Sequence, residues 1–342
     1  MANGTTVAAS IYYSDNTTYT GSGGSKTNPY CIEDLYDLIK NPRINTKPTS
    51  EALYYYYIVV NDIDMNDYDD YKYSPPIGIS LYFTKIDFKN HELRNITIYN
   101  SGIPTKNIFN VMGHSTSTSI YNLKLTNFIS YSSSVTLFAI SIKVSSCKFY
   151  FYNCDFSIYT DTTLAGIGPI GSILGVNNYN YTEYVYCYNC IFNIKGNLLS
   201  DTNGGCIIDD ESLYMYYCHI HLYIIKNLFS LISEIGTFTS SYITGDIYGS
   251  TCNNNSLIYS LTLDKLINSY VNVNFHNTNP NNPTPIYGCY GGSGNSCGSA
   301  FFINKSKLEG FTASPGITNY YELTDEECKD VNKLQEIGFL VG

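Results

Sequence analysis

A short strand-like segment recurs along this chain. Its copies align at seven positions, spaced between 23 and 36 residues apart: Ile96, Leu123, Cys154, Cys190, Cys218, Ser241 and Ser269. A period of this length is typical of one supersecondary unit that stacks on copies of itself. Because the unit contains strands and Asn-, Ser- and Gly-rich turns but no long helix, the sequence predicts the coils of a parallel β-helix.

Alternation of apolar and polar residues indicates which side chains face inward. Cys154, Phe156 and Ile158 share one face, because successive strand residues point to opposite sides. This face is nearly all apolar in the other copies too, so we predict that it lines the lumen. An asparagine precedes the aligned position in five copies: Asn95, Asn122, Asn153, Asn189 and Asn268. Asparagine tolerates a left-handed corner, and its amide can bond to its counterparts in adjacent coils.

The pattern divides the chain into three regions. We predict an N-terminal segment with a capping helix over residues 1–50, the β-helix over 51–276, and a linker with a capping or docking tail over 277–342. Helical spacing over residues 32–40, ended by Pro42, predicts the first cap. Such a cap protects the unpaired strand edges of the first coil.

A second short helix is predicted in the tail. Thr324 and Glu327 have the spacing of a capping box, with Thr324 at the N-cap. Leu334 and Ile337 form an apolar stripe, and Gly338 ends the helix. We expect this helix to close the far end of the solenoid.

Charge and the N-terminus limit the location and partners. A net charge of −10 argues against nucleic acid and against an anionic membrane, since both need a basic surface. Residues 1–6 show neither the charged nor the apolar region of a secretion signal, so we expect synthesis in the cytoplasm of a host cell.

The eleven cysteines are expected to be mostly buried free thiols that pack as small apolar side chains. Cys187 and Cys190 have C-x-x-C spacing. Residues three apart on an extended strand point to opposite faces, however, which argues against zinc or redox chemistry. The best-placed pair for a disulfide is Cys289 with Cys297, in a Gly-rich loop.

Several N-terminal motifs resemble those of a known group of proteins. They are Asn28–Ile32 (NPYCI), Asn61–Met65 (NDIDM), Pro76–Gly78 (PIG) and Asp87–Ile96 (DFKNHELRNI). In this order they resemble the opening of right-handed β-helix surface proteins of bacteria and phages, including those with GLUG repeats. The resemblance covers residues 20–128 by motif and continues to 275 by coil pattern, although Lys89 replaces a family glycine. It implies a right-handed, single-stranded β-helix and surface exposure, but no single activity.

Three groups of acidic residues are candidates for catalytic or calcium-binding roles. Asp62 and Asp64 begin a calcium-loop pattern, but the sixth position lacks glycine and the twelfth lacks glutamate, so a solvated turn is favoured. Residues 209–211 (Asp-Asp-Glu) are expected in a solvated turn between coils. On the outward face of the repeating strand we expect only one carboxylate, Asp155, whereas glycoside hydrolysis needs two.

His219 and His221 are expected to point outward from one strand. They could share a metal ion, but exposed or interface histidines are favoured because no third ligand is predictable. The sequence therefore assigns no catalytic, cofactor-binding or metal-binding residue.

These observations favour a non-enzymatic phage virion protein: a tail fibre, a tailspike-like protein or a capsid appendage. Its β-helix would serve assembly and binding to host-surface glycans. The outward residues Tyr99, Ile191, Tyr242 and Tyr270 suggest contact with further copies, as a homotrimer or larger assembly, and with other virion proteins. Two alternatives stay open: a β-helical polysaccharide lyase or hydrolase, and a bacterial surface adhesin.

Overall fold

The structure is a computed structural model. It describes residues 24–40, 55–69, 79–81, 84–98, 106–111, 117–130, 135–140, 148–161, 174–175, 184–197, 208–226, 232–248, 258–260, 266–267, 269–276, 284–285, 287–289, 301–304, 311–312, 320–324 and 326–336. Strands dominate this part of the chain and pair in parallel in sheets of fifteen, eleven and two strands.

The fifteen-stranded sheet is called sheet 1. It contains β1 (Tyr30–Ile32), β2 (Tyr55–Val59), β4 (Ile79–Leu81), β5 (Thr84–Asp87), β8 (Lys106–Val111), β9 (Ser117–Tyr121), β11 (Val135–Ile140), β12 (Lys148–Tyr152), β14 (Leu174–Gly175), β15 (Tyr184–Tyr188), β17 (Ile208–Tyr216), β19 (Ile232–Thr239), β21 (Ile258–Ser260), β22 (Leu266–Ile267) and β25 (Tyr287–Cys289). The start of β17 pairs with β14 and its end with β15, so this strand joins two rows of stacked strands.

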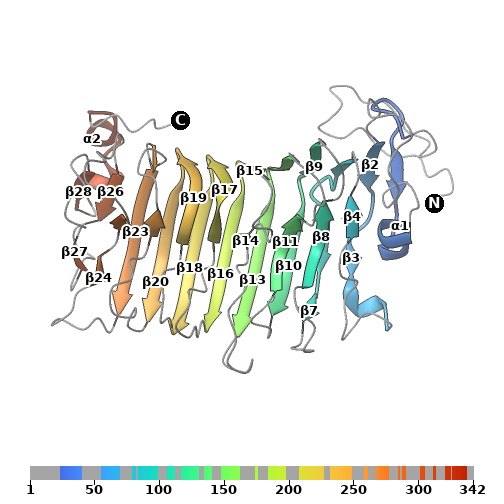
Figure 1. Ribbon diagram of the computed structural model, residues 1–342, viewed down its shortest axis with the longest axis horizontal. Helices are drawn as coiled ribbons and strands as arrows, with labels where there is room; N and C mark the ends of the chain where they lie inside the picture. Colours follow the sequence, from blue (N-terminus) through green and yellow to red (C-terminus); the bar gives the residue numbers. More distant parts are fainter. Residues whose placement is uncertain are drawn as a thin grey trace.

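The eleven-stranded sheet is called sheet 2. It contains β3 (Ile63–Asp64), β6 (Glu92–Arg94), β7 (Thr97–Ile98), β10 (Lys124–Ser130), β13 (Asp155–Asp161), β16 (Ile191–Asn197), β18 (His219–Lys226), β20 (Tyr242–Tyr248), β23 (Ser269–His276), β26 (Phe301–Asn304) and β28 (Tyr320–Leu323). The small sheet pairs β24 (Thr284–Pro285) with β27 (Phe311–Thr312). Figure 1 shows the strands side by side along the long axis, which confirms the predicted all-β parallel solenoid.

The repeated segment stacks as predicted in six of its seven copies. The residues after the aligned positions pair in one column: Lys124, Asp155, Ile191, His219, Tyr242 and Tyr270. The aligned residues themselves are all buried: Leu123, Cys154, Cys190, Cys218, Ser241 and Ser269. The lumen is therefore lined by the predicted face.

The copy at Ile96 was aligned wrongly. Leu93, not Ile98, pairs with Leu125. Ile96 lies instead near Ile129: its carbonyl accepts from the Ile129 amide, and the next residue, Thr97, pairs with Ile129. The cause is a second left-handed corner in this coil. Asn90 and Asn95 both have positive φ, at 65° and 61°, so the motif around Asn95 mimics the corner that belongs at Asn90.

Three of the five predicted asparagine corners stack as expected, whereas Asn95 accepts instead from the Asn127 amide at 2.6 Å and Asn268 lies outside the described residues. Asn122, Asn153 and Asn189 have φ of 54°, 53° and 53°. The amide of Asn189 donates to Oδ1 of Asn153 at 2.9 Å, and the amide of Asn153 donates to Oδ1 of Asn122 at 3.4 Å. At the start of this ladder Asn122 donates to the buried carboxylate of Asp87 at 2.8 Å.

Short helices lie at both ends of the stack (Figure 1). Helix α1 (Leu35–Lys40) buries Leu35 and Leu38, but it begins later than predicted because Ile32 belongs to β1, which pairs with β2. None of the helices described is long and apolar enough to span a membrane.

The tail forms the predicted capping box, but around a different element. The Thr324 hydroxyl accepts from the Glu327 amide at 3.2 Å, and the Glu327 carboxylate accepts from the Thr324 amide at 2.8 Å. This box begins the 3-10 turn Glu327–Lys329, whereas α2 (Val331–Glu336) is capped by Asp330. No residue of α2 is fully buried, although Leu334 is half-buried; Ile337 and Gly338, the other residues of the predicted helix end, lie outside the described residues.

Stacked strands extend beyond the predicted range 51–276 at both ends. Strand β1 pairs with β2 before it, and β26 and β28 continue sheet 2 after it. Another 3-10 turn, Met65–Asp67, follows β3.

Candidate functional site

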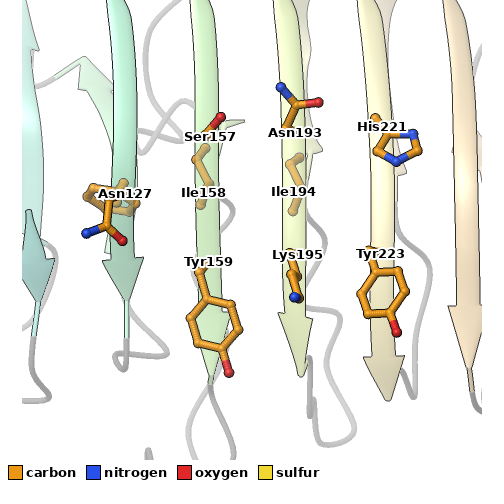
Figure 2. A pocket seen from close by; sticks show the side chains of 10 residues that line it. Asn127, Ser157, Ile158, Tyr159, Asn193, Ile194, Lys195, His221 and Tyr223 are labelled. Carbon is orange, nitrogen blue, oxygen red and sulfur yellow. The ribbon is translucent and has the colours of Figure 1, made fainter. Parts of the chain in front are cut away.

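An open groove crosses the outer surface of sheet 2 over β10, β13, β16 and β18 (Figure 2). Its volume is about 380 Å³. Ten residues line it: Asn127, Phe128, Ser157, Ile158, Tyr159, Asn193, Ile194, Lys195, His221 and Tyr223. Because the side chains of Phe128, Ile158 and Ile194 are buried, the polar and aromatic residues provide the accessible surface.

The parallel register places six of these residues in two rows across the strands: Ser157, Asn193 and His221 in one, and Tyr159, Lys195 and Tyr223 in the other. Figure 2 shows both rows. Neighbouring strands lie about 4.8 Å apart, so each row presents a functional group at that interval. The coil repeat thus produces a regular array of hydrogen-bonding groups.

A β-bulge shapes one end of the groove. Leu125 pairs with Phe156 and Phe128 with Ile158, so β10 holds one residue more than β13 in this interval. Asn127 lies in the bulge with φ of 51°, a left-handed conformation that asparagine tolerates better than most residues. The bulge therefore places Asn127 at the edge of the groove, where its amide donates to Oδ1 of Asn95 at 2.6 Å.

Aromatic rings continue from the groove onto β20 and β23. The Lys195 ammonium lies 5.2 Å from the centre of the Tyr223 ring, within cation–π range. Tyr223 contacts Tyr248, with ring centres 5.7 Å apart, and Tyr248 stacks on His276 at 4.2 Å. Nε2 of His276 lies 3.0 Å from a carboxylate oxygen of Asp246.

The two predicted outward histidines meet at one hydroxyl group. Nε2 of His219 lies 2.8 Å from Oγ1 of Thr244, and Nδ1 of His221 lies 2.9 Å from the same oxygen. Tyr242 stacks on His219, with ring centres 4.2 Å apart. Burial lowers the pKa of His219, and the neighbouring His221 lowers it further.

Asp155 lies beside the groove. Burial raises the pKa of its carboxyl group, and a hydrogen bond from the Asn193 amide at 3.3 Å opposes this rise. The expectation of a single carboxylate on this face is wrong, because Asp246 on β20 and Glu92 on β6 share the outward side of sheet 2. Asp246 was not predicted because it is the third outward residue of β20, which continues to Tyr248, and the prediction covers only the first two outward residues of each copy.

The predicted acidic turn contains a charged network. The Asp64 carboxylate accepts from the Asn66 amide at 2.9 Å, which is the expected turn contact. Arg94 lies within ion-pair distance of three carboxylates: Asp64 at 3.0 Å, Glu92 at 3.5 Å and Asp62 at 3.8 Å. The arginine gathers these carboxylates because β3 and β6 are adjacent strands.

Hydrogen bonds keep two of these carboxylates ionised. The Glu92 amide, followed by His91, holds the pKa of Asp62 below its usual value. Burial opposes ionisation of Asp64, but hydrogen bonds from Asn95, the Asn66 amide and Arg94 outweigh it and lower its pKa.

The prediction that Cys187 and Cys190 point to opposite faces is wrong. Both side chains are buried rather than on opposite faces, because the left-handed corner at Asn189 turns the chain between them. The expectation of free buried thiols is confirmed where the structure describes them: Cys31, Cys154, Cys187, Cys190 and Cys218. Burial raises the pKa values of the Cys187 and Cys218 thiols, which disfavours the reactive thiolate.

Other predicted residues lie elsewhere. Residues 209–211 belong to β17 instead of a turn, since this strand spans two rows of sheet 1, and their side chains are outside the described part. The side chains of Tyr99 and Tyr270 and the pair Cys289 and Cys297 also fall outside it. Within the described ranges, no group of three or more His, Cys, Asp or Glu side chains is arranged to hold a metal ion.

The sequence reasoning missed a surface on the opposite sheet. Seven tyrosines on β9, β12, β15 and β17 form two stacked columns, called here the tyrosine ladder: Tyr121, Tyr152, Tyr188 and Tyr216 in one, and Tyr150, Tyr186 and Tyr214 in the other. Consecutive ring centres are 4.7–5.1 Å apart. The repeated Tyr-x-Tyr pattern before each corner was the available signal.

No protein-family model, curated protein or solved structure matches the chain.

Proposed function

We propose that this chain is a non-enzymatic structural protein of a phage virion, as a tail fibre, tailspike-like protein or capsid appendage, which binds host-surface glycans through the groove of sheet 2. The observation that carries the binding role is the double row of polar and aromatic side chains across adjacent coils. The virion role is supported by the N-terminal motifs that resemble those of surface β-helices.

The groove has the chemistry that a glycan needs. Amides of Asn127 and Asn193 and the hydroxyl of Ser157 both donate and accept hydrogen bonds, as sugar hydroxyl groups do. Tyr159 and Tyr223 add aromatic surface with a polar end, which suits apolar patches of sugar rings. Because these groups stand on paired strands, little ordering entropy opposes binding.

A polysaccharide lyase or hydrolase is the second candidate. One observation favours it: burial raises the pKa of Asp155, and a raised pKa makes a carboxyl group better suited to act as a general acid. No carboxylate lines the groove itself, however. Binding without turnover therefore accounts better for the groove.

The binding proposal is tested on an array of bacterial surface polysaccharides. We expect Tyr223→Ala and Asn193→Ala to weaken binding of any retained glycan by roughly tenfold, as loss of a good hydrogen bond or aromatic contact does. Tyr186→Ala, on the opposite sheet, is the matched control and should bind as the wild type does. Equal glycan binding by all three variants would exclude the groove as the glycan-binding site.

Absence of turnover is a separate prediction. Incubation with the retained glycan should release no new reducing ends and no unsaturated uronates. Turnover that disappears in Asp155→Asn would establish the enzyme instead. The virion role has its own test. Antibodies against the protein should label purified particles of the phage that encodes it, and unlabelled particles would contradict this role.

A further inference from the structure

His219 and His221 direct two ring nitrogens at a single point. The hydroxyl of Thr244 lies within 2.9 Å of both nitrogens. Since one hydroxyl group can donate to one nitrogen and accept from the other, the two rings can both be neutral. Their convergence is built into the strand, because residues two apart on β18 share its outward face.

The separation of the rings is close to that of two rings on a shared metal ion. Their centres lie 6.0 Å apart, with the planes at 65°. Two neighbouring imidazoles on one ion have centres about 5 Å apart, because each metal–nitrogen distance is about 2.0–2.1 Å, so the two rings would have to approach by about 1 Å. Thus, little rearrangement separates the observed pair from a coordinating pair.

We propose that His219 and His221 form a binding site for a divalent transition-metal ion of the kind imidazole prefers, such as Zn²⁺, Cu²⁺ or Ni²⁺. The ion takes the place of the Thr244 hydroxyl between the two nitrogens. Two protein ligands leave further coordination positions open to water or to oxygen atoms of a bound molecule, as in metal sites that exchange ligands.

The surroundings favour this site. Tyr242 stacks on His219 and restrains the orientation of its ring. His276 differs, since its Nε2 contacts the carboxylate of Asp246.

The test uses the full chain without an affinity tag. Zn²⁺ is titrated against a chromophoric chelator, and electron paramagnetic resonance of the Cu²⁺ complex counts coordinated nitrogens. We expect one site with two imidazole nitrogens. His219→Ala and His221→Ala should each weaken Zn²⁺ binding by more than the roughly tenfold cost of losing an outer-shell partner. His276→Ala is the matched control and should retain both signals.

Two results would overturn the proposal: a Cu²⁺ signal from fewer than two nitrogens in the wild type, or Zn²⁺ affinity that is unchanged in both single variants. Circular dichroism establishes that the variants are folded, which is expected because both residues lie on the outward face of β18. The titration contains no glycan, so its outcome is independent of the proposed function.

Discussion

Single residues at the corners determine how tightly each coil turns. The ladder Asn122–Asn153–Asn189 ends at Tyr217, which adopts the same left-handed conformation at φ of 57°. Tyr217 has no side-chain amide, so it cannot continue the ladder of amide hydrogen bonds that accompanies this conformation at the asparagine corners. For a residue other than glycine, such a backbone costs on the order of 1–3 kcal/mol, and asparagine tolerates it better.

Tyr217→Asn is therefore expected to raise the free energy of unfolding by about 1 kcal/mol, through relief of strain and a new amide bond to Asn189. Little packing is lost, because Tyr217 is 64% exposed. Urea unfolding measures the change. Ile191→Asn is the matched control: this residue is 41% exposed but lies in extended strand β16, so no gain is expected. Equal stabilisation by both would contradict the corner explanation.

Among the elements, sheets 1 and 2 differ in the side chains on their outer faces. Sheet 1 stacks near-parallel tyrosine rings, with planes 9° apart between Tyr152 and Tyr188 and between Tyr188 and Tyr216. Burial and the neighbouring tyrosines raise the pKa of Tyr186 to about 12, and burial also raises the pKa values of Tyr152 and Tyr188.

The tyrosine ladder makes the solenoid sensitive to alkali. An unfolded tyrosine loses its proton near pH 10, whereas Tyr186 keeps its proton until about pH 12. In that interval the folded state binds more protons, so this stabilisation is complete below about pH 10 and is lost as the pH rises toward 12. Thermal melts across this range should show falling stability. The variant Tyr186→Phe should lessen the slope, and an unchanged slope would contradict the assignment.

At the scale of the whole molecule, the solenoid exposes long outer faces. The tyrosine ladder itself contains no charged side chain, although Lys85 and Lys148 lie beside it on the same face of sheet 1. Ile191 and Tyr242 on sheet 2 are exposed as predicted, at 41% and 40%. Other surface carries most of a net charge of −10, which repels like copies. Two columns of stacked aromatic side chains form a surface where copies can meet, so they favour self-association.

We expect the purified chain to form a homotrimer or a larger assembly at micromolar concentration. Light scattering decides this, because one chain has a mass of 38.3 kDa and any assembly a multiple of it. Tyr188→Glu should shift the assembly toward the monomer, since it places a carboxylate within the stacked tyrosine column. A wild-type mass of 38.3 kDa would contradict self-association.

The amino-acid sequence by itself determined the coil and its lumen. Alternation around Cys154 and Cys190 identified the buried face, because strand geometry relates each residue to those two positions away. Asparagine at a corner was likewise readable from its backbone preference. These are local properties, and local patterns specify them.

Contacts between coils were decided by the tertiary structure. Thr244 reaches His219 and His221 only because β20 stacks on β18, and Cys187 is buried only because the corner at Asn189 redirects the chain. The groove depends on the register of four strands, and a single bulge in β10 shifts that register. Because coil lengths vary along the chain, the spacing of residues in the sequence does not determine which of them become neighbours. Backbone pairing between adjacent coils determines it.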